Sequence, residues 1–241
     1  MQDWAERTYL LIGQQAAEAL ADAHVVIVGV GGVGAYAAEM VARAGVGHIT
    51  IVDGDTVSVS NINRQLPALH STIGLDKVAV MQHRIADINP EAHIDALKMF
   101  ITPDTIAQVL GDKKPDFVID AIDSIAPKVA LIEHCLNSGI NIISSMGAGG
   151  RIDPTAVRYA DISQTYNDGL ARVIRTRLRK DGFGKGLTVV WSEEQPIESS
   201  LTYTDEMPGK RSSYGTVSYL PCIFGCMLAA YVINQLRQAN D

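Results

Sequence analysis

Short apolar runs alternate along this chain with segments that carry apolar residues at helical spacing. The runs predict buried parallel strands over residues 25–30, 48–52, 93–100, 116–122 and 140–145. Between them, the helical spacing predicts helices over residues 35–47, from about Asp76 to 89, 102–110 and 126–139. This alternation predicts an α/β fold: a Rossmann-like, doubly wound, mostly parallel sheet that binds ligand beyond the carboxyl ends of its strands.

The flanks of this core follow other patterns. Residues 3–21 predict an N-terminal helical arm that is interrupted near Gly13. Beyond residue 155, strands are expected over 156–162 and 187–192, and the apolar run 219–233 is too short for a membrane span of about 20 residues. We therefore expect a single domain over 1–241, made of an arm (1–22), a core (23–154) and a C-terminal α+β extension (155–241) that ends in a buried helix.

A Gly-rich turn follows the first apolar run. Gly29, Gly31 and Gly34 fit the pattern G-x-G-x-x-G, with Gly32 between them. The first glycine permits a tight turn, the second lets the backbone approach phosphate, and the third lets the helix pack on the strand. Asp53 follows the second strand, where a carboxylate can hydrogen-bond a ribose hydroxyl. This pattern predicts a nucleotide site, and alone it would suggest NAD.

Composition narrows the class of protein. The net charge of −7 and a pI of about 5.3 argue against a protein that coats nucleic acid through its overall field. The first twenty residues contain no signal-peptide core, so we expect a cytoplasmic protein without a membrane span. Three cysteines are too few for a disulfide framework or a four-cysteine zinc site. The six histidines are scattered without the spacing of metal ligands, and the sequence assigns them no role.

Further motifs separate a nucleotide activator from a dehydrogenase. They are Asp53 with Asp55 in VDGD, the cluster SNINRQ at 60–65, Lys77, and Asp123 in DAIDS. With VGVGGVG, this set resembles the ATP-binding residues of the adenylating enzymes related to ubiquitin-activating enzymes, which include the molybdopterin- and thiamin-pathway activators. The similarity extends through SMGAGGRIDPT and the C-terminal apolar segment, and so covers nearly the whole chain.

The resemblance implies a site for ATP and Mg²⁺. Arg64 and Lys77 would hold phosphate oxygens and stabilise the charge that gathers at the α-phosphate. Asp123 would hold the magnesium ion. Asn61 and Asn63 are expected to hydrogen-bond ribose or phosphate. Asp55 is expected to belong to the nucleotide site, where it would support Asp53, and Asp120 to be a structural acid. Residues 23–154 would then be a nucleotide-binding core, and 155–241 a substrate-binding extension.

The resemblance also implies an assembly. Arg7 matches an arginine that related activators extend from the N-terminal arm to the ATP of the partner subunit, which predicts a homodimer. A solvated arginine on a helix is the alternative interpretation of Arg7. A partner from a sulfur-relay or cysteine-desulfurase system is a further expectation that comes from the resemblance alone.

Within this superfamily the chain is most similar to enzymes that act on threonylcarbamoyladenosine beside the anticodon of tRNA. Such an enzyme uses ATP to adenylate the carboxylate of the threonylcarbamoyl side chain, which then cyclises and releases AMP. For the tRNA, Arg172, Arg175 and Arg179 lie at spacings of three and four, so a helix would place them on one face. A solvated helix face is the alternative interpretation.

Three other functions remain open from the sequence. An activator of the C-terminus of a ubiquitin-like or sulfur-carrier protein is the nearest rival, followed by a non-catalytic nucleotide-bound scaffold. Relatives that transfer a group to cysteine need a suitable thiol, whereas Cys222 and Cys226 lie in the apolar C-terminal segment. A dehydrogenase is more distant, because hydride transfer has no obvious use for Arg64, Lys77 and Asp123.

Overall fold

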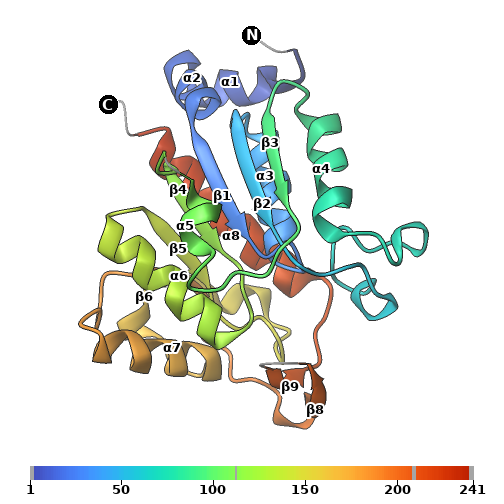
Figure 1. The fold of residues 1–241 in the computed structure, drawn as a ribbon, viewed down its shortest axis with the longest axis vertical. Helices are drawn as coiled ribbons and strands as arrows, with labels where there is room; N and C mark the ends of the chain where they lie inside the picture. The colour runs from blue at the N-terminus through green and yellow to red at the C-terminus, as the bar shows by residue number, and fades with distance from the viewer. Residues whose placement is uncertain (1–2, 112, 208–209, 239–241) are drawn as a thin grey trace.

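The computed structural model describes residues 3–111, 113–207 and 210–238, and a seven-stranded sheet lies at its centre (Figure 1). The strand order is β3-β2-β1-β4-β5-β7-β6, and all neighbouring strands are parallel except β6, which pairs antiparallel with β7. The strands are β1 (His24–Val28), β2 (His48–Val52), β3 (His93–Leu97), β4 (Phe117–Asp120), β5 (Ile142–Ser145), β6 (Val157–Asp161) and β7 (Thr188–Ser192). A separate hairpin consists of β8 (Leu201–Met207) and β9 (Lys210–Tyr214).

Helices cover both faces of this sheet (Figure 1). They are α1 (Glu6–Ile12), α2 (Gln14–Asp22), α3 (Gly34–Arg43), α4 (Lys77–Ile88), α5 (Ile106–Leu110), α6 (Ile125–Ser138), α7 (Gly169–Lys180) and α8 (Tyr219–Leu236). Alternate residues of β1 explain the two layers. Val25 and Ile27 pack with α3, α4 and α8, whereas Val26 and Val28 pack with α5, α6 and α7. The strand is therefore apolar on both faces, as its sequence predicts.

The predicted fold class is confirmed, with local differences. The helix expected over 35–47 ends at Arg43, and the strand expected over 93–100 ends at Leu97. The helix expected over 102–110 is shorter, because the Oγ1 of Thr105 accepts a hydrogen bond from the N–H of Thr102 (2.9 Å) and closes a turn before α5 begins. The hairpin β8–β9 was not expected, because its residues carry no strong apolar alternation. The strands of the extension, β6 and β7, continue the same sheet as the core. The division of the domain at residues 22 and 154 remains a prediction.

The strand order places a crevice beside β1. The chain runs outward from β1 to β2 and β3, then returns to the other side of β1 as β4. At such a reversal the connections leave the carboxyl ends of the two central strands in opposite directions, which opens a place for ligand. The Gly-rich turn after β1 and Asp123 after β4 both lie at this edge.

α8 is a core helix of this fold. Among the residues that the structure describes, it is the one helix long and apolar enough to cross a membrane by length and composition. Leu220, Phe224 and Leu228 are fully buried, and α8 packs on α3 and on the sheet. A side chain on Gly225 would overlap the carbonyl oxygen of Val33, so the two helices meet at backbone distance. The expectation of a buried C-terminal helix agrees with this packing.

Replacement of Gly34 by alanine should destabilise the fold. The added Cβ would overlap the Gly29 carbonyl oxygen, which is backbone and cannot rotate away. We expect Gly34→Ala to lower the free energy of unfolding by at least about 2 kcal/mol, measured by urea denaturation. Gly169→Ala is the control, because its Cβ would meet nothing within 4 Å. Equal urea midpoints for the two variants would contradict the assigned contact.

Candidate active site

The Gly-rich turn joins β1 to α3 at the crevice. Gly29 has a φ of +89°, and a Cβ there would lie 2.8 Å from the carbonyl oxygen of Ala121. Gly34 lies against the Gly29 carbonyl itself. Both positions need glycine because backbone passes backbone without room for a side chain. The amino terminus of α3 is thereby held at the mouth of the crevice, and such a terminus favours an anion.

Two other glycines bring a second loop against the turn. A Cβ on Gly31 would lie 3.5 Å from Nε2 of Gln65, and a Cβ on Gly32 would lie 3.5 Å from Cγ of Arg64. The same Cβ on Gly32 would lie 3.2 Å from Pro221 of α8. The cluster SNINRQ therefore lies beside the turn, although about thirty residues separate the two in sequence.

Asp53 ties the turn to the end of β2. Its Oδ2 accepts a hydrogen bond from the N–H of Val30 (2.8 Å), and its Oδ1 accepts one from the N–H of Asp55 (2.8 Å). Burial raises the pKa of Asp53, against the opposing charge of Lys77. Each oxygen of a carboxylate can accept more than one hydrogen bond, so the predicted contact with a ribose hydroxyl is compatible with this geometry.

Lys77 begins α4 and is nearly buried, with 6% of its side chain exposed. Its Nζ lies 2.9 Å from Oδ2 of Asp55, and its N–H donates to the Asp55 carbonyl (3.1 Å). Asp55 thus contacts both Asp53 and Lys77. This pair holds the ammonium group at the carboxyl end of β2, near Asp53, where the resemblance expects a phosphate contact.

The side chains of Asn61 and Asn63, in SNINRQ, form hydrogen bonds with other groups of the protein. Oδ1 of buried Asn61 accepts from the N–H of Ser58 (3.1 Å), and Nδ2 of Asn63 donates to the Thr216 carbonyl (2.9 Å). Oδ1 of Asn63 accepts from Nη1 of Arg64 (2.8 Å). These bonds shape the loop and orient Arg64. Contacts of the two amides with ATP remain predictions.

Arg64 and Asp123 lie close enough for their charges to interact. Burial lowers the pKa of the Arg64 guanidinium, and the negative charge of Asp123 opposes that shift, so the two groups interact. Asp123 is exposed just beyond β4, and Oγ of Ser124 donates to its Oδ1 at 3.5 Å. An exposed carboxylate beside a phosphate site is the ligand type that Mg²⁺ uses together with phosphate oxygens.

A buried ion pair fixes the end of β4, next to Asp123 in the chain. Nζ of Lys128 lies 2.8 Å from Oδ2 of Asp120, and both side chains are fully buried. Lys128 also donates to the Ile122 carbonyl (2.9 Å), while Oγ of Ser144 donates to Asp120 (2.6 Å). Asp120 therefore has the structural role expected of it. The sequence patterns did not identify Lys128 as part of this ion pair. A lysine on the apolar face of a helix that follows an acidic residue at the end of a strand is a signal that could have indicated the pair.

Arg7 lies apart from this group. It is exposed on α1, and α1 and α2 lie at the amino ends of the strands, at the opposite edge of the sheet from the Gly-rich turn (Figure 1). Arg7 therefore does not join the other predicted site residues within one chain. The same arm exposes Leu10 and Leu11, at 79% and 84%.

The predicted basic helix forms as α7, with Asp168 as its N-cap. Arg172 and Arg179 are exposed. Arg175 is half-buried, and its Nη1 donates to the carbonyl (2.9 Å) and Oγ1 (2.6 Å) of Thr165, which leaves less of its guanidinium for an external phosphate. Two of the three arginines are thus fully available on the surface.

A second missed residue, Arg151, fixes the start of α7. It is 3% exposed, and its guanidinium donates to the carbonyls of Asn167 (2.7 Å) and Glu194 (3.0 Å) and lies 3.4 Å from Asp168. Its position after the Gly-rich stretch 147–150 gave no signal of burial. Arg151 thus helps to hold the loop after β5 against the start of α7, together with the N–H of Gly147, which donates to Oδ2 of Asp168 (2.9 Å).

Two of the cysteines, Cys135 and Cys222, are poor nucleophiles. Burial raises the pKa of the Cys135 thiol to about 12 and that of Cys222 to about 11. Cys226 lies one turn from Cys222 on α8. At neutral pH a thiol of such high pKa is almost entirely protonated, so it reacts slowly.

Known proteins match this chain over nearly its whole length. The model of the ThiF family matches residues 5–241. The tRNA threonylcarbamoyladenosine dehydratase of Bacillus subtilis (strain 168) is 44% identical over 237 residues, which cover 95% of this chain and 93% of the relative. The crystal structure of the Escherichia coli tRNA N6-threonylcarbamoyladenosine dehydratase in complex with ATP is 39% identical, with a TM-score of 0.86, and the match covers 96% of this chain and 92% of that one.

A more distantly related enzyme matches a smaller part of the chain. The molybdopterin-synthase adenylyltransferase of Escherichia coli (strain K12) is 34% identical over 152 residues, which cover 63% of this chain and 57% of the relative. The resemblance drawn from the motifs is confirmed by the family match over nearly the whole chain. This protein belongs to the ThiF family.

Proposed function

We propose that this protein is an ATP-dependent tRNA threonylcarbamoyladenosine dehydratase. The observation that carries the proposal is the whole-chain similarity to the dehydratase of Bacillus subtilis, at 44% identity. The shorter match to a molybdopterin-pathway activator gives less support to the rival function, activation of a carrier protein. The ATP complex of the Escherichia coli dehydratase supports ATP as the nucleotide.

The site residues would act on ATP through charge and position. The amino terminus of α3 and the cations of Arg64 and Lys77 would hold the phosphates, and Asp53 would accept a hydrogen bond from the ribose. Asp55 keeps Lys77 in place, with 2.9 Å between the two charged groups. Asp123 would be a ligand of Mg²⁺, which would neutralise charge on the departing pyrophosphate.

The reaction needs two substitutions. A carboxylate oxygen of the threonylcarbamoyl group attacks the α-phosphorus, the bond to the β-phosphate oxygen breaks, and pyrophosphate leaves. A carbamoyl atom of the same side chain then attacks the acyl carbon, the bond to the AMP oxygen breaks, and a carbamoyl proton is lost. The side chain loses one water in total, because the oxygen leaves with AMP. The high pKa of Cys135 and Cys222 is consistent with a route that needs no enzyme thiol.

The tRNA would contact α7. Arg172 and Arg179 are exposed on a helix that ends with Arg179 and Lys180, in a chain whose net charge is −7. A local basic face in an acidic protein can bind phosphates at one place while limiting indiscriminate binding elsewhere.

We place the reaction in the cytoplasm. A sulfur-relay or cysteine-desulfurase partner stays a prediction from the family resemblance.

The active enzyme would be a homodimer in which each ATP site receives Arg7 from the other chain. Two observations support a second copy as the partner of the arm. The helix that carries Arg7, α1, lies at the amino ends of the strands, whereas the Gly-rich turn lies at their carboxyl ends (Figure 1). Leu10 and Leu11 of the same helix are exposed, and paired apolar side chains of this kind are typical of an interface.

Loss of Arg64 or Asp123 should reduce turnover more than stability. We expect Arg64→Ala and Asp123→Ala each to lower the rate of AMP release on modified tRNA by about a hundredfold or more, because each removes a contact that stabilises charge in the transition state. Arg237→Ala and Asp87→Ala, both distant from the crevice, are the matched controls. ATP with Mg²⁺ should also bind more tightly than NAD. Wild-type rates in both site variants would refute the site assignment.

Removal of the exposed arginines of α7 should weaken tRNA binding in a salt-dependent way. The double variant Arg172→Ala/Arg179→Ala should lower the slope of log K against log salt by up to about two units, with ATP binding unchanged. The control Lys113→Ala/Arg237→Ala removes the same charge elsewhere. An unchanged slope would place the tRNA surface elsewhere. Failure of the wild-type protein to bind modified tRNA would favour activation of a carrier protein.

Mixed dimers test the contribution of Arg7. Arg7→Ala chains and Asp123→Ala chains, each inactive alone, should regain roughly a quarter of wild-type activity after subunit exchange, since half of the dimers are mixed and each has one intact site. Mass spectrometry of the intact dimers would verify the exchange. If mixed dimers form without any recovery of activity, Arg7 does not act across the interface.

A further inference from the structure

A row of imidazoles lies at the end of the sheet where the strands β1, β2 and β3 begin, away from the nucleotide site. His24, His48 and His93 are the first residues of β1, β2 and β3, and the parallel register pairs His24 with His48 and His48 with His93. Side chains at paired positions of parallel strands point to the same face. The rings of His24 and His48 stack with centroids 3.7 Å apart, and the rings of His48 and His93 meet edge to face at 4.6 Å.

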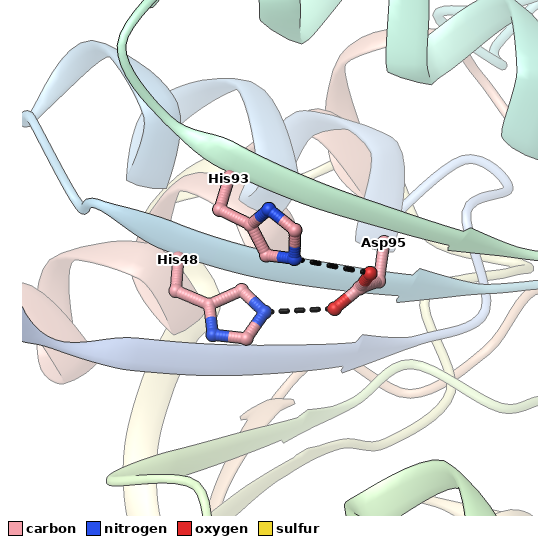
Figure 2. A group of neighbouring side chains, drawn as sticks. All are labelled: His48, His93 and Asp95. Atoms are coloured by element: carbon pink, nitrogen blue, oxygen red, sulfur yellow. Dashed lines mark hydrogen bonds and ion pairs between the residues drawn. The ribbon is translucent and has the colours of Figure 1, made fainter.

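A carboxylate joins two of these imidazoles. Asp95 lies two residues beyond His93 and therefore shares its face of β3. Its Oδ2 lies 2.8 Å from Nε2 of His48, and its Oδ1 lies 3.3 Å from Nε2 of His93 (Figure 2). His24 is turned to another partner, since its Nε2 lies 2.9 Å from Oγ1 of Thr50. Two imidazole nitrogens and one carboxylate thus converge within 4.8 Å.

These three groups suit a borderline divalent metal ion. Two imidazole nitrogens and a carboxylate are ligands typical of Zn²⁺ and its neighbours, whereas Mg²⁺ and Ca²⁺ prefer oxygen ligands. Ligand atoms bound tetrahedrally at about 2.0–2.1 Å from Zn²⁺ lie about 3.3 Å apart. The ligand atoms of the three side chains lie within 4.8 Å of one another, with nitrogen–oxygen separations of 2.8 Å to Oδ2 and 3.3 Å to Oδ1 of Asp95. Rotation of the side chains would bring one atom of each within bonding distance of a shared ion.

The site is open to solvent on one side. His48 and Asp95 line a cleft of about 590 Å³, and residues 108–110 of the short helix α5 line the same cleft. His93 has 70% of its side chain exposed, and Asp95 has 42%. Two acidic side chains, Asp22 and Asp116, and two basic ones, Lys113 and Lys114, also line the cleft. An ion can therefore enter, and a water molecule can complete its coordination.

We propose that His48, His93 and Asp95 bind one Zn²⁺ or a similar divalent transition-metal ion. The ion would cross-link the edge strand β3 to β2, through ligands from both strands. This site is independent of the proposed dehydratase reaction, because it lies at the amino ends of the strands whereas the Gly-rich turn lies at their carboxyl ends. Its role is to stabilise the edge of the sheet, since an ion that binds only the folded chain raises its stability.

Metal titration of the full-length protein tests the proposal. Protein stripped with a chelator and freed of nucleotide is titrated with Zn²⁺ by calorimetry and with Co²⁺ by visible absorption, which reports the coordination of cobalt. We expect one ion per chain in the wild-type protein. His48→Gln, His93→Gln and Asp95→Asn should each weaken binding by at least about tenfold. Zn²⁺ should raise the melting temperature of the wild-type protein more than that of these variants.

Matched controls separate this site from other metal ligands. His83→Gln and Asp87→Asn, which change exposed residues of α4, should bind as the wild-type protein does. Another variant could misfold and lose ATP binding as well as the metal. In that case His93→Gln is the deciding variant, because this exposed side chain contributes little to the packing of the core. The proposal is wrong if no saturable site exists or if His93→Gln binds normally. It is also wrong if Cys222→Ser/Cys226→Ser abolishes binding.

Discussion

The close approach of α3 to β1 determines the rest of the candidate site. Gly34, the first residue of α3, lies directly against the Gly29 carbonyl, and any side chain there would push the helix away from the strand. Because α3 is held this near, its amino terminus reaches the crevice between β1 and β4, and the 60–65 loop packs against the same turn. A helix held even slightly farther out would leave its N–H groups too far from any phosphate to bind it.

Much of this arrangement could be predicted, because its signals are local. The apolar runs predict the five core strands. The glycines at which two backbone segments come into contact, Gly29 and Gly34, belong to the recognisable pattern G-x-G-x-x-G. The partners of polar side chains are not local in this sense. Arg151 is buried among the carbonyls of segments 16 and 43 residues away. These bonds leave no trace in the sequence, because they depend on how distant loops meet.

The histidines show the same limit more clearly. His48 and His93 are 45 residues apart, so no spacing rule for metal ligands relates them. The register between β2 and β3 brings them together, and that register is set by the packing of apolar residues along both strands. Lys128 is an intermediate case. Its sequence neighbours predict a buried helix face, but only the adjacent Asp120 makes a charge acceptable there.

The packing of α8 has a consequence for the order of assembly during synthesis. α8 supplies Pro221 beside Gly32 and packs through Gly225 on Val33, and it follows every strand of the sheet along the chain. A ribosome therefore releases all seven strands of the large sheet before it releases the helix that closes one side of the Gly-rich turn. Until then the apolar surface of α3 that α8 covers is exposed and the Gly-rich turn lacks one of its walls, and exposed apolar surface of this kind makes an unfinished chain prone to aggregate.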